Sequence, residues 1–208
     1  MAQCNCESDS TFSGQSDGFK STLWLIIAIN LLMFVVEFIA SFTADSMALR
    51  ADALDFLGDS ITYSITLVAI GLSVKWRASV AMFKGITLAA MGIWVLGSTV
   101  YRMFVLGVPN ETIMGSVALV AFVANAVSAL LLVKYREGDA NVRSVWLCSR
   151  NDAIGNLAVL LAAVGVYVTN SKLPDLVVAG FMASLFLHSS ILIIRQSYKE
   201  FYAVPPEL

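Results

Sequence analysis

Charged residues are scarce in this chain of 208 residues. Asp, Glu, Lys and Arg make up only 13% of the sequence, against roughly a quarter in an ordinary soluble domain, whereas 58% of the residues are hydrophobic. No cluster of basic residues is dense enough to follow a phosphate backbone. The composition therefore excludes an ordinary soluble domain and gives no support for a nucleic-acid partner.

Cysteine is also rare, and the three cysteines, Cys4, Cys6 and Cys148, do not suggest a disulfide framework. The first 20 residues are polar, acidic and rich in serine and glycine. They lack the basic start and the short apolar region of a signal peptide. We expect residues 1–20 to form a disordered cytoplasmic tail.

Long apolar runs occupy most of the remaining chain. Six of them reach the roughly 20 residues that a helix needs to cross a bilayer: 23–42, 47–74, 85–106, 113–133, 145–169 and 176–194. We therefore predict an all-α membrane protein with six transmembrane helices. Residues 21–196 would form one transport domain, and residues 197–208 a short cytoplasmic tail.

The basic residues of the connecting segments predict the orientation of these helices. The segments opposite the termini carry only Arg102 and Lys172, whereas the other side carries nine basic residues: Lys20, Lys75, Arg77, Lys84, Lys134, Arg136, Arg143, Arg195 and Lys199. Because lysine and arginine favour the cytoplasmic side, we expect both termini to be cytoplasmic. We place the protein in a bacterial inner (plasma) membrane.

Acidic residues are concentrated around the second apolar run. Four of them fall on one stripe of a helix with about 100° per residue, namely Asp45, Asp52, Asp55 and Asp59. The fifth run carries a second polar stripe, in which Cys148, Asp152 and Asn156 follow one another at one-turn spacing. Because an ionisable group inside a membrane costs about 3 kcal/mol, such groups tend to face the bundle interior and serve a function.

The spacing within these stripes is that of metal ligands. Asp55 and Asp59 are four residues apart, as are Cys148 and Asp152, and this spacing aims two side chains at one point beside a helix. If the second and fifth helices face each other, the two pairs supply four ligands to one tetrahedral ion. A structural network with two nearby arginines is the alternative, but it would leave several of the polar groups unsatisfied.

These two segments resemble the helix motifs of the cation diffusion facilitator family. Residues 46–60 are similar to the family's second-helix motif, His or Asp followed by x-x-x-Asp, and residues 148–156 to its fifth-helix motif, usually His-x-x-x-Asp. The resemblance covers all six spans and implies a helical bundle that exports divalent metal ions. It assigns the transported ion to four ligands: Asp55, Asp59, Cys148 and Asp152.

The chain departs from the family pattern in two places. Cys148 stands where a histidine is usual, and a thiolate among carboxylates suits zinc or cadmium better than manganese, magnesium or calcium. The sequence stops at Leu208, whereas most members continue into a cytoplasmic domain that binds metal and helps the protein to dimerise. We expect a short member without that domain, forming a homodimer through its transmembrane helices.

Charge balance within the predicted site indicates how transport is driven. Three carboxylates and a thiol in a low dielectric cannot all be ionised, so an empty site should hold protons that a divalent ion displaces. We predict zinc or cadmium efflux by metal/proton antiport through alternating access, with no resident cofactor and no enzymatic activity. A manganese, iron or cobalt transporter of this family and an intramembrane aspartate-dependent enzyme remain as alternatives.

Several other polar residues are candidates for supporting roles. Asp52 and Asn156 share the two polar stripes and are predicted to orient the ligands, although Asp52 is also a candidate alternate ligand. In the first span, Asn30 and Glu37 resemble polar residues of the family's first helix and are candidates for the ion path. The N-terminal tail contains a candidate pair for capturing incoming metal, Cys4 and Cys6.

Overall fold

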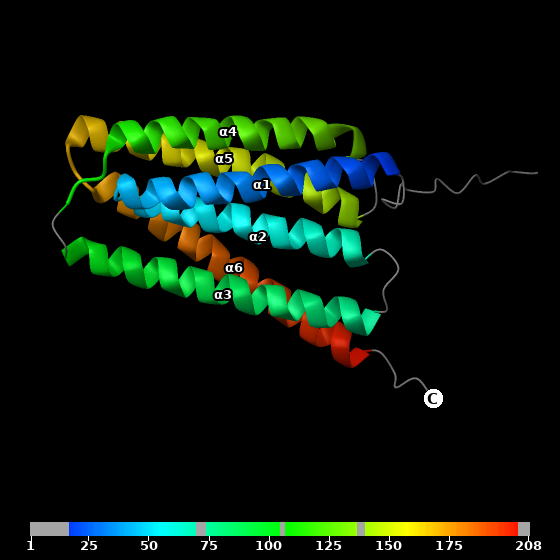
Figure 1. The fold of residues 1–208 in the computed structure, drawn as a ribbon. Coiled ribbons are helices and arrows are strands. Elements are labelled where there is room, and N and C mark those ends of the chain that lie inside the picture. The colour runs from blue at the N-terminus through cyan, green and yellow to red at the C-terminus, as the bar shows by residue number, and fades with distance from the viewer. Residues whose placement is uncertain (1–16, 70–73, 105–106, 137–139, 204–208) are drawn as a thin grey trace, which may run out of the picture.

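The chain forms six long helices in an up-and-down bundle. The structure is a computed structural model that describes residues 17–69, 74–104, 107–136 and 140–203. Over these residues the chain forms α1 (Asp17–Thr43), α2 (Met47–Ala69), α3 (Val74–Phe104), α4 (Glu111–Leu132), α5 (Ala140–Thr169) and α6 (Leu173–Ala203), with one 3-10 turn, Val133–Tyr135, after α4. The start of α1 and the end of α6 lie at the same end of the bundle (Figure 1). The predicted all-α bundle of six helices is confirmed.

The helices extend beyond the predicted spans at the end of the bundle that holds both termini. The prediction that the second span reaches residue 74 was wrong, because α2 ends at Ala69 and Val74 begins α3. Residues 75–84, predicted as a connection, form the first part of α3. This segment contains no glycine or proline before Gly85, and its lysines and arginine favour a helix. α1 and α6 likewise run into the predicted tails, from Asp17 and to Ala203.

The most extensive helix contacts join α3 to α6, α4 to α5 and α1 to α2. In Figure 1 the pair of α3 and α6 lies along one side of the other four helices. Two glycines of α3 allow the close approach of α6: a Cβ atom at Gly85 would lie 2.7 Å from Ile194 Cγ1, and one at Gly92 would lie 3.0 Å from Leu187 Cγ. These small residues therefore pack helices within one protomer.

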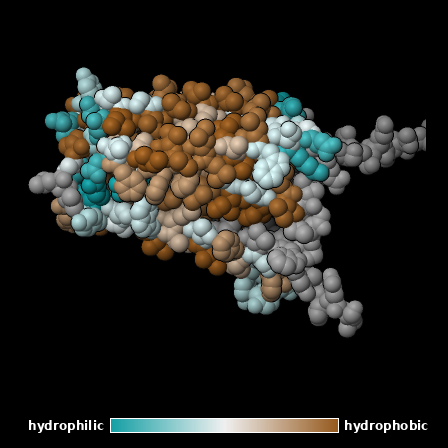
Figure 2. All heavy atoms as spheres, viewed as in Figure 1, coloured by the Kyte–Doolittle hydropathy of each residue, from teal (hydrophilic) through white to brown (hydrophobic). Residues whose placement is uncertain are grey.

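Helix α2 differs from its neighbours in polarity. Five helical segments of the described chain are long and apolar enough to cross a membrane, and α2 is not among them. With 23 residues α2 is still about 34 Å long, which is enough to span the hydrocarbon layer. α2 packs against α1, α3, α5 and α6, so its acidic stripe is shielded from lipid. Figure 2 shows apolar side chains covering the middle of the bundle, with hydrophilic groups towards its ends.

The first turn of α2 is capped by a side chain from a distant helix. Asp175, near the start of α6, accepts hydrogen bonds from the backbone N–H groups of Met47 (2.8 Å) and Ala48 (3.0 Å) and from the Ser46 hydroxyl (2.5 Å). The Ser46 Oγ in turn accepts from the Leu49 N–H at 3.1 Å. A carboxylate at a helix N-terminus satisfies donors that have no partner within the helix. Asp175 therefore joins α6 to α2 at the end of the bundle opposite the termini.

Candidate metal site

Three of the four predicted metal ligands line one cavity. The cavity has a volume of about 380 Å³ and lies between α2, α5 and α6, and its lining includes Asp55, Asp59 and Asp152. Apolar side chains of α6 form much of the opposite wall, and Thr62 and Asn151 add further polar groups. Carboxylates from two helices thus face one space inside the bundle.

The fourth predicted ligand, Cys148, belongs to α5, but its side chain lies outside the part of the chain that the structure describes. Within the described part, no three side chains of the types His, Cys, Asp and Glu are grouped closely enough to hold a metal ion. The carboxylates therefore share a cavity without forming a closed coordination shell. Their role as metal ligands stays a prediction.

A buried tyrosine that the sequence analysis did not identify orients one of these carboxylates. The Tyr63 hydroxyl donates to Asp59 Oδ2 at 2.5 Å and lies 3.1 Å from the Ser149 Oγ of α5. Tyr63 and Ser149 are almost fully buried, with 0% and 1% of their surface exposed. Tyr63 follows Asp59 by four residues and continues the acidic stripe, which is the sequence signal that could have identified it.

Behind the cavity lies a second set of buried side chains, which we call the buried polar cluster: Glu37, Asp52, Asn125 and Asn156. Asn125 Nδ2 donates to Asn156 Oδ1 at 3.0 Å, and Asn156 Nδ2 donates to Asp52 Oδ2 at 3.1 Å. The Glu37 carboxyl lies within hydrogen-bonding reach of the Asp52 carboxyl. The cluster joins α1, α2, α4 and α5, and none of its four residues lines the metal cavity.

The remaining candidates lie apart from the cavity. Asn30 is buried in α1, where its Oδ1 has no hydrogen-bond partner, and it does not line the cavity. Asp45, counted with the acidic stripe, lies in the connection between α1 and α2 and forms an ion pair with Arg102. Cys4 and Cys6 lie outside the described residues.

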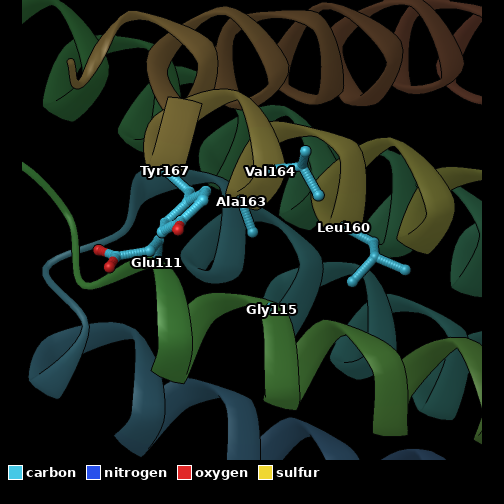
Figure 3. A pocket seen from close by; sticks show the side chains of 6 residues that line it. All are labelled: Glu111, Gly115, Leu160, Ala163, Val164 and Tyr167. Carbon is cyan, nitrogen blue, oxygen red and sulfur yellow. The ribbon is translucent and has the colours of Figure 1, made fainter. Parts of the chain in front are cut away.

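A second pocket, of about 180 Å³, lies between α4 and α5. Figure 3 shows the Glu111 and Tyr167 side chains close together near one end of this pocket and Leu160 near the other. The rest of the lining is apolar, and Glu111 is its only carboxylate. One carboxylate does not make a metal site, so this pocket is a weaker candidate than the cavity between α2, α5 and α6, which three carboxylates line.

Comparison with known proteins places this arrangement in a family. Residues 23–202 match the model described as the cation efflux transmembrane domain. The chain is 27% identical to the zinc transporter ZitB of Yersinia pestis, over 95% of this chain and 67% of that protein. It is 21% identical to the metal cation efflux system protein CzcD of Cupriavidus metallidurans, over 86% and 61% of the two chains.

A third relative is the cadmium, cobalt and zinc/H(+)-K(+) antiporter of Bacillus velezensis, 23% identical over 78% of this chain and 56% of that protein. The chain thus spans between about half and two thirds of the length of these relatives. The family match nevertheless covers nearly all of its helical part. This protein is an integral membrane protein that belongs to the cation diffusion facilitator family.

Proposed function

We propose that this protein exports divalent metal ions, zinc or cadmium, from the cytoplasm in exchange for protons. The observation that carries the proposal is the cavity inside the bundle, which receives Asp55 and Asp59 from α2 and Asp152 from α5. Carboxylates are costly in the middle of a membrane and tend to mark an ion path. The names of the relatives, which include zinc, cadmium and cobalt, support a divalent ion as the substrate.

The shape of the bundle supports entry from the end that holds both termini. Along α2 the cavity lining runs from Asp55 to Thr62, and along α6 it reaches Ile193, so the cavity extends from the middle of the bundle towards that end. At the opposite end, Asp175 holds the start of α2. The Arg102–Asp45 ion pair joins α3 to the connection before α2. These contacts would have to open for release on the other side.

Charge balance supports exchange with protons. The described lining of the cavity contains three carboxylates and no lysine or arginine. Such a group needs positive charge, which protons supply before the metal binds and the divalent ion supplies afterwards. Metal and protons then compete for the same oxygens. Exchange follows if the cavity opens alternately to the two sides of the membrane.

Metal preference depends on Cys148. A thiolate beside three carboxylates would favour zinc or cadmium, whereas a site of oxygen ligands alone favours manganese and other harder ions. Apart from the Met182 thioether, the described lining offers oxygen ligands, which keeps the manganese, iron or cobalt transporter as the second candidate. The family match favours transport over the intramembrane enzyme. A homodimer formed by the transmembrane helices remains a prediction.

The test is metal uptake into proteoliposomes with and without a pH gradient, using zinc, cadmium, manganese and cobalt in parallel. The proposal predicts zinc and cadmium uptake that a pH gradient accelerates, and a Cys148→Ser variant that loses these two activities more than manganese uptake. If Cys148→Ser leaves all four rates unchanged, the thiol is not a ligand. Absence of uptake for every metal would refute the transport proposal.

A further inference from the structure

Two side-chain contacts join α2 directly to α5, one on each side of the predicted metal ligands. On the side nearer the termini, the Ser149 Oγ of α5 lies 3.1 Å from the Tyr63 hydroxyl oxygen of α2. On the other side, Asn156 Nδ2 of α5 donates to Asp52 Oδ2 of α2 at 3.1 Å. All four side chains are buried. We call these two contacts the α2–α5 links.

The predicted ligands with described side chains fall between the two links. On α2, Asp55 and Asp59 belong to the segment 52–63, whose two ends carry the links. On α5, Asp152 belongs to the segment 149–156, which is joined to α2 at both of its ends. The links therefore bracket the cavity that receives these three carboxylates.

Between the links, open space separates the two helices. α2 packs most extensively against α1, and α5 packs most extensively against α4. Gly58 of α2 and Gly155 of α5 both line the cavity, and a Cβ atom at Gly155 would have no neighbour within 4 Å. Because side chains do not fill this space, the hydrogen bonds at its two ends hold one ligand helix against the other.

The link through Tyr63 also reaches a predicted ligand. A tyrosine hydroxyl has one hydrogen, which Tyr63 donates to Asp59, so its oxygen accepts the hydrogen of Ser149. Successive hydrogen bonds in such a chain polarise and strengthen one another. Ser149 does not line the cavity, so it influences the site as a positioning residue, through Tyr63.

We infer that the α2–α5 links set the size selectivity of the metal site, with Tyr63 and Ser149 as specificity-determining residues that limit how far the two ligand helices can separate. The inference rests on the proposed function and adds to it a reason for a preference among divalent ions. Selectivity between metal ions depends on the size and flexibility of the site, and ligands keep a precise geometry only when surrounding contacts hold them. A site whose two helices are tied together accommodates small ions better than large ones.

Selection by size differs from the selection by softness that Cys148 would provide. Cadmium is larger than zinc, and manganese is larger than cobalt, so each pair compares a large ion with a small one. Loss of a thiolate weakens zinc and cadmium together relative to manganese. Loss of a link instead favours the larger ion within each pair, because the helices can then move apart.

The experiment measures the affinity of the purified protein for zinc, cadmium, manganese and cobalt by competition with a fluorescent chelator, together with zinc uptake into proteoliposomes. The variant is Ser149→Ala, which removes one link and leaves the hydrogen bond from Tyr63 to Asp59. Ser149→Thr restores a hydroxyl and is the rescue variant. The matched control is Ser128→Ala, which removes a buried serine hydroxyl that donates within its own helix, to the Ala124 carbonyl of α4.

We expect Ser149→Ala to raise both the cadmium-to-zinc and the manganese-to-cobalt affinity ratio by about two- to tenfold, the factor that corresponds to one neutral hydrogen bond. Ser149→Thr and Ser128→Ala should keep the wild-type ratios. A purely structural role of Ser149 would lower the unfolding temperature and move neither ratio. Ratios that stay unchanged, fall or move in opposite directions would overturn the inference. If Ser149→Ala does not fold, Tyr63→Phe is measured against the same outcomes.

The two proposals fail in different ways. If wild-type protein moves no metal into proteoliposomes, the proposed function is wrong. If wild-type protein takes up zinc and Ser149→Ala keeps both affinity ratios, only the selectivity role of the links is wrong. Each ratio compares two ions on the same protein sample, so partial loss of folded protein does not change it.

Discussion

Removal of the Tyr63 hydroxyl tests how Asp59 is oriented. Tyr63→Phe deletes the donor that lies 2.5 Å from Asp59 Oδ2 and keeps the aromatic ring. That ring is fully buried against apolar residues that include Leu23 and Leu132, so the packing should persist. The substitution therefore isolates the hydrogen bond from the core.

The expected magnitude follows from the charge on the acceptor. A hydrogen bond to a charged group contributes about 1.5–3 kcal/mol, and loss of a partner that orients a ligand lowers metal affinity by roughly 10–100-fold. Since about 1.4 kcal/mol corresponds to a factor of ten, the two figures agree. We expect Tyr63→Phe to weaken zinc binding by about 10–100-fold.

The assay is competition for zinc between the purified protein and a fluorescent chelator, with thermal unfolding measured on the same samples. Tyr198→Phe is the matched control, because it removes a tyrosine hydroxyl from an exposed position on α6. A double-mutant cycle then compares Tyr63→Phe alone with Tyr63→Phe in an Asp59→Asn background. The hydroxyl acts through Asp59 only if its removal has no further effect there.

Two results would refute this reasoning. Unchanged or tighter zinc binding in Tyr63→Phe would show that the hydroxyl does not prepare Asp59 for the metal. An equal loss of affinity in both backgrounds would show that the hydroxyl acts on the fold and not on this carboxylate.

Three further substitutions test the helix contacts that position the cavity. Asp175→Ala leaves three donors at the start of α2 without their acceptor and should lower the free energy of unfolding by about 3 kcal/mol or more. Arg102→Ala breaks an ion pair with a part-exposed acid and should cost about 1 kcal/mol or less. Gly85→Ala places a methyl group against α6 and should destabilise by about 1–3 kcal/mol, whereas Gly97→Ala, with no neighbour within 4 Å, should be neutral or stabilising. Denaturant or thermal unfolding in detergent measures all three, and a stability loss in Gly97→Ala equal to that in Gly85→Ala would contradict the packing argument.

The number of helices could be predicted from the sequence because each apolar run is long enough to span a bilayer. The end of α2 could not be predicted in this way, because hydropathy indicates which residues can lie in lipid but not where a helix ends. Residues 75–84 are basic enough to resemble a connection, yet they form the first turns of α3. Helix length and hydrophobic length therefore differ at this end of the bundle.

The candidate site could be predicted in part, because one-turn spacing places Asp55 and Asp59 on the same helix face. Spacing alone could not separate Asp52 from them, since all three lie on one stripe. The family resemblance assigned the ligand role to Asp55 and Asp59, and in the structure the neighbouring helices separate the three residues: the two predicted ligands line the cavity, whereas Asp52 contacts Asn156 and Glu37. The cap provided by Asp175 was missed for the same reason, because it depends on a contact between α6 and α2.

Zinc flux through Asp59→Asn tests the central claim most directly. The variant keeps the size of the side chain and removes one carboxylate from the cavity, and the exposed Asp17→Asn serves as its control. The account predicts that proteoliposomes with Asp59→Asn lose zinc uptake driven by a pH gradient, while those with Asp17→Asn keep the wild-type rate. Wild-type zinc uptake in folded Asp59→Asn protein would contradict the assignment of this cavity as the transport site.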